Sequence, residues 1–211
     1  MTDQAAEVAS TRERICAAAF DLFGEKGYDG ASMNELAERV GIAKPSIYNY
    51  FKSKEELLVA LVERAIRHWE ERCMAPLAAE PTFERQLAGH LRECVAVSSQ
   101  NPHMVAVFHL ATTHTQGELA ARIQAIVESM EHGIQASFTA RIDEAVSRGE
   151  LSADVATADR IVFMAVFFHG LLFLQTNCPH QTGPLQERLE EVWRLLYRGV
   201  AGRLPQEPLL S

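Results

Sequence analysis

The sequence predicts an all-α fold, with a short N-terminal part built around a helix-turn-helix and a larger helical part after it. Apolar residues recur every three or four positions along most of the 211 residues, which is the period of a buried helix face. Most Gly and Pro residues stand between these periodic segments. No segment shows the alternation of an exposed β-strand or the spacing of a β-α-β unit. A hydrophobic content of 47% is enough for a sizeable core.

The segment 32–54 has the pattern of two short helices joined by a tight turn. Ser32 can cap the first helix, and Glu35, three residues later, can complete a capping box. Gly41 can adopt the left-handed conformation that ends a helix, and Pro45 suits the first turn of the next one. These signals predict a helix-turn-helix, whose second helix can enter a DNA major groove.

The second helix of this segment combines a buried side with a basic and aromatic side. Ile47 and Phe51 are four residues apart and are predicted to face inward. Residues 44–54 contain three lysines and no acidic residue, within a chain of net charge −8. This local positive charge, next to Tyr48 and Tyr50, favours attraction to phosphates over the alternative of an ordinary solvated helix face.

Capping boxes and apolar periodicity also outline the other helices. The box at Ser10 predicts that the first helix begins there, after a frayed arm of residues 1–9. Gly24 or Gly27 is predicted to end this helix. The remaining predicted helices cover residues 53–76, 83–100, 103–112, 118–147, 156–175 and 185–200, with a loop at 177–183.

The predicted helix 156–175 is apolar on all sides. Its longest apolar run, Ile161 to Leu174, has 14 residues, fewer than the roughly 18 that suggest a membrane span. A helix that is apolar all round needs cover all round. We therefore expect this helix to be buried on most sides by protein, and we expect no membrane contact.

The sequence carries no recognisable catalytic, metal or disulfide pattern. The four cysteines are far apart and predict buried thiols, whereas a redox sensor would need an exposed thiol of low pKa. No two histidines have the i, i+4 spacing of a helical metal site. Nucleophile-elbow, zinc-protease, phosphate-loop and dinucleotide-loop motifs are absent. We expect no enzymatic activity, no metal and no cofactor, and the N-terminus lacks the apolar core of a signal peptide.

Residues 41–57, Gly-Ile-Ala-Lys-Pro-Ser-Ile-Tyr-Asn-Tyr-Phe-Lys-Ser-Lys-Glu-Glu-Leu, resemble the signature of the TetR family of bacterial transcriptional repressors. The stretch from Ile15 to Tyr28 resembles that family's first helix and the turn after it. The resemblance implies a DNA-binding domain over residues 1–51 and an effector-binding and dimerisation domain over residues 52–211. It also implies a homodimer held together by the last two helices.

On the positions that match the family, the resemblance assigns DNA contacts to the helix-turn-helix. Lys44 and Pro45 stand where the family meets base edges, and Asn34 on the first helix is a further position that can reach a base. Lys suits guanine, and Asn suits adenine. The other implied contacts are mainly to phosphates. The full set is Ser32, Asn34, Lys44, Pro45, Ser46, Tyr48, Asn49, Tyr50 and Lys54. For Tyr50, packing against the first helix is the alternative.

A surplus of aromatic and Met residues between positions 104 and 173, together with the ligand cavity of the family, suggests an apolar effector pocket. For each residue taken singly, ordinary core packing is the alternative. Few Lys or Arg residues fall on these apolar faces, so a neutral or cationic hydrophobic compound suits the pocket better than an anion. The residues expected to line it are His90, Met104, Phe108, His109, Thr112, Met130, Phe138, Phe163, Phe167 and His169.

The sequence therefore predicts a cytoplasmic, sequence-specific DNA-binding regulator. Its partners would be a double-stranded DNA operator, a second copy of the chain and a small hydrophobic effector. The expected mechanism is a repressor that the effector releases from a palindromic operator. One alternative is a constitutive regulator or nucleoid-occlusion-type factor of the same fold without an effector. The other is an activator or a protein-partner adaptor. The sequence does not separate these roles from that of a repressor, because the position of the operator decides between them.

Overall fold

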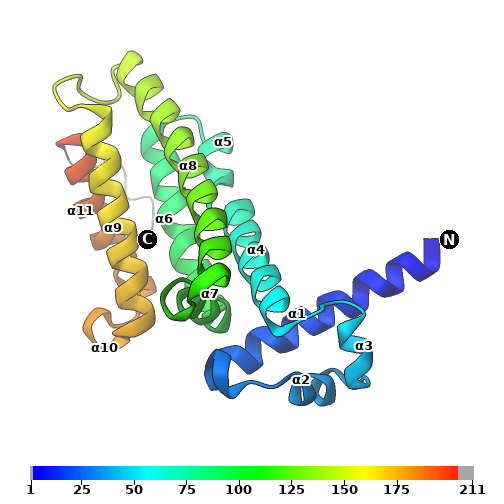
Figure 1. Cartoon of the computed structure of the whole chain (residues 1–211). Helices are drawn as coiled ribbons and strands as arrows, with labels where there is room; N and C mark the ends of the chain where they lie inside the picture. Colours follow the sequence, from blue (N-terminus) through cyan, green and yellow to red (C-terminus); the bar gives the residue numbers. More distant parts are fainter. Residues whose placement is uncertain (1, 204–211) are drawn as a thin grey trace. The chain divides into compact units, whose positions relative to one another are not determined.

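The computed structural model describes the backbone of residues 2–203, and the side chains of residues 10–203 except those at positions 176, 177, 179 and 182. Its regular elements are all helical, and no strand occurs in the range described (Figure 1). The predicted all-α class is confirmed. The elements are α1 (Thr2–Gly30), α2 (Met33–Val40), α3 (Lys44–Tyr48), α4 (Lys54–Cys73), α5 (Ala75–Ala79), α6 (Phe83–Gln100), α7 (Pro102–His114), α8 (Gly117–Ser147), α9 (Thr157–Asn177), α10 (Pro179–Thr182), the 3-10 helix η1 (Leu185–Arg188) and α11 (Leu189–Ala201).

The chain forms two compact units. Unit 1 comprises Met1–Arg67 and Asn101–Val127, and unit 2 comprises His68–Gln100 and Glu128–Ser211. The break falls inside α4 and again inside α8, and α7 belongs to unit 1. The compact units therefore do not separate at residue 51, although the functional division at that residue stays a prediction.

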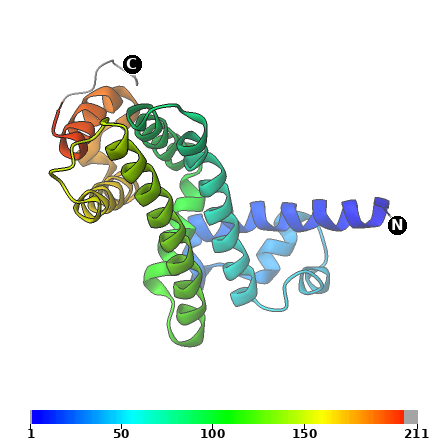
Figure 2. The ribbon, with the colours of Figure 1, turned by 90° about the horizontal axis from the view of Figure 1, so that it is seen from above.

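Unit 1 is organised around α1. Ile15, Leu22 and Phe23 on this helix are buried, and the helix packs against α7 and α2. The helix begins at Thr2, so the predicted start at Ser10 is wrong. The residues before Ser10 are mostly good helix formers, which lets the helix continue through the capping box. Its N-terminal end extends past α2 and α3 (Figure 2). Gly27, with φ 71°, interrupts the helix as predicted.

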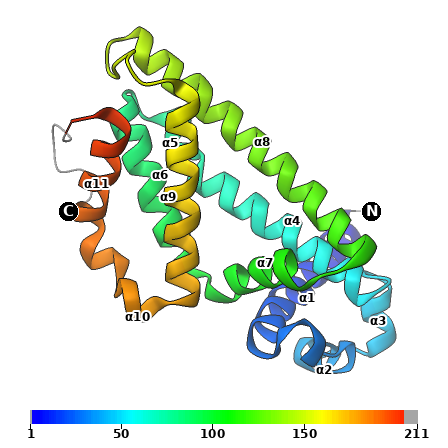
Figure 3. The same cartoon turned by 60° about the vertical axis from the view of Figure 1, so that its left-hand side comes forward.

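Unit 2 has its core between α6, α8, α9 and α11. The helices α6, α9 and α11 contact one another and lie side by side (Figure 3). Glu150, in the turn after α8, accepts the Phe83 N–H at 2.7 Å and so closes the start of α6. Buried residues of this core are Leu87, Leu91, Ile142, Met164, Trp193, Leu196 and Tyr197.

Two expectations about the C-terminal third are wrong. The predicted loop at 177–183 contains the short helix α10. Pro179 can begin this helix, because proline lacks a backbone N–H and the first residue of a helix does not use one. The predicted burial of α9 on most sides also fails, since Val162 and Val166 are 63% and 69% exposed. By length and composition alone, Thr157–Gln175 is long and apolar enough to cross a membrane, and only 11% of it is buried in the chain. A helix that pairs with a second protein passes the same test, so the absence of membrane contact stays a prediction.

Candidate nucleic-acid interface

Helix α2 is capped at both ends as the sequence predicts. The hydroxyl of Ser32 accepts the Glu35 N–H at 3.1 Å, with Ser32 in an extended conformation. Gly41 has φ 75°, and its N–H donates to the Ala37 carbonyl at 3.0 Å. The Glu35 carboxylate does not return to Ser32; it contacts Lys26 and Arg39 instead. The predicted capping box is thus formed on one side only.

An ion-pair network fixes α2 against the end of α1. Arg39 contacts Glu25 at 2.6 Å, and Lys26 contacts Glu35 at 2.7 Å. The hydrogen bond from Lys26 is the main reason that the pKa of the Glu35 carboxyl lies below its ordinary value. Arg14 adds a hydrogen bond to the carbonyl of Val40, the last residue of α2, at 2.6 Å. These contacts set the position of α2, and sequence reasoning missed the roles of Arg14 and Lys26.

Helix α3 has a buried side and an open side. Ile47 is 0% exposed and Phe51, just after the helix, is 1% exposed, so the two predicted inward residues are confirmed. Tyr48 lies between them in sequence and is 40% exposed. The other predicted contact residues are distributed as follows: Ser32, Asn34, Lys44, Pro45 and Asn49 are exposed, whereas Ser46, Tyr50 and Lys54 are half-buried.

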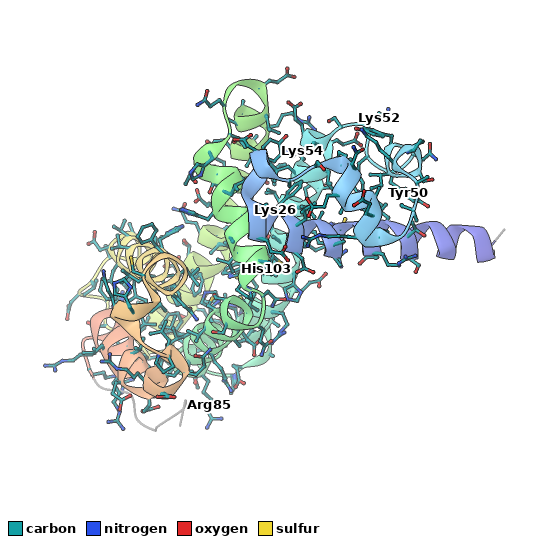
Figure 4. The ribbon with its side chains drawn as sticks, turned by 90° about the horizontal axis from the view of Figure 1, so that it is seen from below. Lys26, Tyr50, Lys52, Lys54, Arg85 and His103 are labelled. Carbon is teal, nitrogen blue, oxygen red and sulfur yellow. The ribbon has the colours of Figure 1, made fainter. Side chains whose placement is uncertain are left out.

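The lysines of this region differ in their surroundings. Among the residues whose side chains the structure describes, neither Lys44 nor Lys52 has a side-chain hydrogen bond or ion pair. The Lys54 ammonium lies 4.3 Å from the centre of the Tyr28 ring, a cation–π contact. Burial lowers the pKa of Lys54, although Asp29 acts in the opposite direction. Lys52 lies in the connection from α3 to α4, near Tyr50, and Lys54 begins α4 (Figure 4). Tyr28 thus holds Lys54, a role that the sequence did not indicate.

The start of α4 is closed by a capping box. The hydroxyl of Ser53 accepts the Glu56 N–H at 3.0 Å. The Glu56 carboxylate accepts the Lys52 N–H at 2.7 Å, one residue before the expected cap. This geometry confirms the predicted helix start. It also fixes the backbone between Lys52 and Lys54, directly after α3.

An exposed, short helix without acidic residues, carried by a capped and ion-paired α2, suits the phosphates and base edges of duplex DNA. Comparison with known proteins agrees with this geometry. Residues 15–61 match the family model described as "Bacterial regulatory proteins, tetR family". The chain belongs to the TetR family. It is a transcriptional regulator of that family, as its relatives are.

Two curated relatives of this TetR-family chain cover most of its length. The fatty acid metabolism regulator protein of Bacillus subtilis (strain 168) is 24% identical over 152 residues, which are 71% of this chain and 76% of the relative. The regulator UidR of Escherichia coli (strain K12) is 27% identical over 158 residues, or 75% and 78% of the two chains. The similarity therefore extends beyond the helix-turn-helix.

Solved structures show the same fold. FadR from Bacillus subtilis, in complex with stearoyl-CoA, has a TM-score of 0.73 at 21% identity and covers 89% of this chain and 98% of its own. A TetR/AcrR-family regulator from Thermobifida fusca has a TM-score of 0.65 at 27% identity, with 89% and 97% covered. AibR, in complex with isovaleryl coenzyme A and operator DNA, has a TM-score of 0.60 at 21% identity, with 78% and 85% covered.

The residues expected to line an effector pocket are divided between the two units. Met104, Phe108, His109 and Thr112 belong to unit 1, and the other six belong to unit 2. Thr112 is exposed, and its hydroxyl bonds to the carbonyls of Phe108 and His109 one turn back. This local bonding is usual for Thr in a helix and is independent of any ligand.

His90 is a core residue of unit 2 with both ring nitrogens engaged. Nδ1 lies 2.7 Å from the Cys73 carbonyl, which it can reach only as a donor. Nε2 lies 3.5 Å from the Cys94 sulfur, so the thiol donates to it. The rings of Phe138 and Phe168 meet the imidazole edge to face at 4.9 and 4.8 Å. Burial lowers the pKa of His90 to about 4, and the contacts favour core packing over ligand binding.

Two predicted pocket residues lie on the outside of unit 2. Phe163 is 40% exposed, and its ring covers Gly199 of α11. The side chain of His169 is 73% exposed. The sequence could not separate these from inward residues, because α9 is apolar on every side. Phe138 is buried, Met130 and Phe167 are half-buried, and their role in an effector pocket stays a prediction. In the described part of the chain, no group of three or more His, Cys, Asp or Glu residues is arranged to hold a metal ion.

Proposed function

We propose that this TetR-family chain is a homodimeric repressor, which binds a palindromic operator through α3 and is released by a small hydrophobic effector. One observation supports the DNA-binding part most strongly. Helix α3 is anchored by Ile47, yet it presents Lys44 and Tyr48 to solvent with no acidic residue between positions 44 and 54. A surface of this kind attracts phosphates and leaves polar groups free for base edges.

Within this proposal the contact residues have separate roles. Lys44 and Asn34, both exposed, read bases. Ser32 accepts a backbone hydrogen bond and keeps its own O–H for a phosphate. Lys54 is held against Tyr28, so it reaches a phosphate with little loss of side-chain entropy. Lys52 has no recorded side-chain partner and adds to the positive field.

The exposed face of α9 supports dimerisation. Val162, Val166 and Phe173 are more than half exposed, and Leu195 on the neighbouring α11 is 70% exposed. An apolar surface of this kind needs a partner. In the TetR family, whose resemblance motivates the proposal, the last two helices pair with their copies. Leu189, at the start of α11, is 9% exposed and belongs to the core of unit 2, so it is not part of this exposed surface.

Relatives suggest where to look for the effector. One curated relative is named for fatty acid metabolism, and two neighbours carry stearoyl-CoA and isovaleryl coenzyme A. An acyl chain suits the apolar residues around Phe138 and Phe167. The anionic coenzyme part would need basic partners, whereas the sequence favours a neutral or cationic compound. Acyl-CoA thioesters and neutral hydrophobic compounds are therefore the two classes to compare.

Two experiments test this proposal. Selection from random duplex DNA with the full chain should return a palindrome, which Lys44→Ala binds with relaxed preference at one base pair of each half-site. Stearoyl-CoA, isovaleryl-CoA and free long-chain alcohols are then titrated into the complex. Release of the DNA by any of these compounds supports the proposed effector. The compound that causes the release identifies the chemical class of the effector. Tight DNA binding that none of the compounds changes would favour the constitutive alternative.

Dimerisation is tested separately. Val166→Glu should split the dimer, because a carboxylate cannot be buried cheaply in an apolar interface. Val155→Glu is the matched control, since Val155 is 45% exposed but precedes α9. Sedimentation of both variants should give a monomer for the first and a dimer for the second. Because the proposed activity is binding to chromosomal DNA, the cytoplasm is the compartment that it requires.

A further inference from the structure

The exposed face of α9 carries one ionisable side chain near its middle. Val162, Val166, His169 and Phe173 follow one another at spacings of four, three and four residues, so they form one line along the helix. The three apolar members are 63%, 69% and 52% exposed. The side chain of His169 is 73% exposed. Between Arg160, which is buried, and Gln175, the sequence has no other ionisable residue.

Two groups lie next to the imidazole of His169. Its Nδ1 lies 2.9 Å from the Ala165 carbonyl, one turn back, which places the N–H on this nitrogen. Its Nε2 lies 3.9 Å from the Glu131 carboxylate on α8. Glu131 is therefore the acidic neighbour of His169, and its side chain is 50% exposed. Water therefore reaches both groups in the single chain.

We infer that His169 makes the association of two copies through this face pH-sensitive, with acid favouring separation. The inference rests on the proposed dimerisation through α9 and α11. In the single chain the imidazole is hydrated in either charge state. Against the apolar face of a second copy it loses water, and loss of water penalises the charged form. Histidine ordinarily changes its charge between pH 5 and 8, so this penalty arises in a mild pH range.

Glu131 opposes the effect. Its negative charge favours the imidazolium form and offsets part of the cost of burying it. A dimer contains two such imidazoles. With Glu131 offsetting part of this cost, we expect the dissociation constant to be about 10-fold larger at about pH 5.5 than at about pH 8.

The experiment uses two pools of the full chain that carry donor and acceptor dyes at the N-terminus. Energy transfer on dilution gives the dissociation constant, and the rate of subunit exchange covers the case of a very tight dimer. His169→Gln removes the charge and should give a flat pH profile. Glu131→Gln removes the offset and should give a steeper profile than the wild type. His132→Gln, an exposed histidine next to Glu131 on α8, is the matched control and should behave as the wild type.

The possible outcomes separate the inference from the proposal beneath it. A wild-type dimer whose dissociation constant and exchange rate do not change with pH would overturn the inference and leave the dimer in place. A His169→Gln dimer that keeps the wild-type pH profile would also overturn it. A chain that is monomeric at every pH and concentration would instead contradict the proposed dimerisation. Circular dichroism at both pH values is the control that checks whether each variant is folded.

Discussion

Arg160 donates its Nε–H to the carbonyl of Val200 at 3.0 Å and thereby joins the start of α9 to the end of α11. Its two other nitrogens donate to the carbonyls of Val155 and Ser152 at 2.6 and 2.7 Å. The side chain is 2% exposed. A buried arginine of this kind is satisfied by backbone oxygens, with the end of a helix as its partner.

We expect Arg160→Met to destabilise unit 2 by about 3 kcal/mol. Methionine keeps the length of the side chain but leaves three carbonyls without their donor, and each lost charged hydrogen bond costs about 1.5–3 kcal/mol, not additively. Urea unfolding at one fixed protein concentration measures the change, because stability of a dimer depends on concentration. Arg198→Lys, at an exposed position of α11, should stay within about 0.5 kcal/mol. Equal stability of Arg160→Met and the wild type would show that the three hydrogen bonds of Arg160 contribute nothing to the stability of unit 2.

Stability should also fall between about pH 6.5 and pH 4 because of His90. The folded chain holds this pKa at about 4, below the ordinary value of 6.5. Between these pH values His90 is protonated in the unfolded chain but stays neutral in the folded chain, so acid favours unfolding. The full effect is of the order of 3 kcal/mol. Urea titrations at several pH values should show a shallower decline for His90→Leu than for the wild type. Parallel declines would mean that His90 is not the group responsible.

Ser32 has two roles that substitutions can separate. Ser32→Ala removes the acceptor of the Glu35 N–H and should cost about 1 kcal/mol of stability. Ser32→Asp keeps a good cap, so thermal stability should be preserved, but its negative charge should weaken DNA binding. Melting curves and binding isotherms are measured for both variants. Unchanged DNA binding by Ser32→Asp would remove Ser32 from the interface.

Tyr48→Ala should abolish tight operator binding while the fold is kept. Tyr48 is 40% exposed although Ile47 and Phe51 on either side of it in the sequence are buried, so its truncation removes a contact surface and little of the core. Circular dichroism checks the fold, and a duplex containing the selected operator checks binding. A large loss of thermal stability with unchanged affinity would place Tyr48 in the core instead.

The helix-turn-helix could be predicted almost residue by residue because local chemistry specifies it. Ser32, Gly41 and Pro45 each act on their own backbone or on that of residues a few positions away, so their roles are readable from the sequence. The start at Ser10 failed for the same local reason, since helix propensity continued past the cap. What depends on distant residues was not readable: the contact of Lys54 with Tyr28 and the hydrogen bond from Arg14 to Val40 are set by tertiary packing.

The C-terminal part shows the limit more clearly. Periodicity located α6, α8, α9 and α11, but an apolar helix does not show which of its sides faces its own chain. Phe163 and His169 were therefore assigned to a pocket and are exposed. Arg160 stands directly before the apolar run Ile161 to Leu174, and it is buried. A charge whose partners are backbone carbonyls leaves no signal in the side-chain pattern.

Selection of binding sites from random duplex DNA is the decisive measurement for sequence-specific DNA binding by a dimer. The full chain should enrich a palindrome with half-sites related by the two-fold axis of the dimer. We also expect that affinity for this sequence falls steeply with salt, and that Lys54→Ala lowers the salt slope by about one unit. Failure to enrich any sequence, or equal binding to the best sequence and to unrelated DNA at every salt concentration, would show that the chain is not a sequence-specific DNA-binding protein.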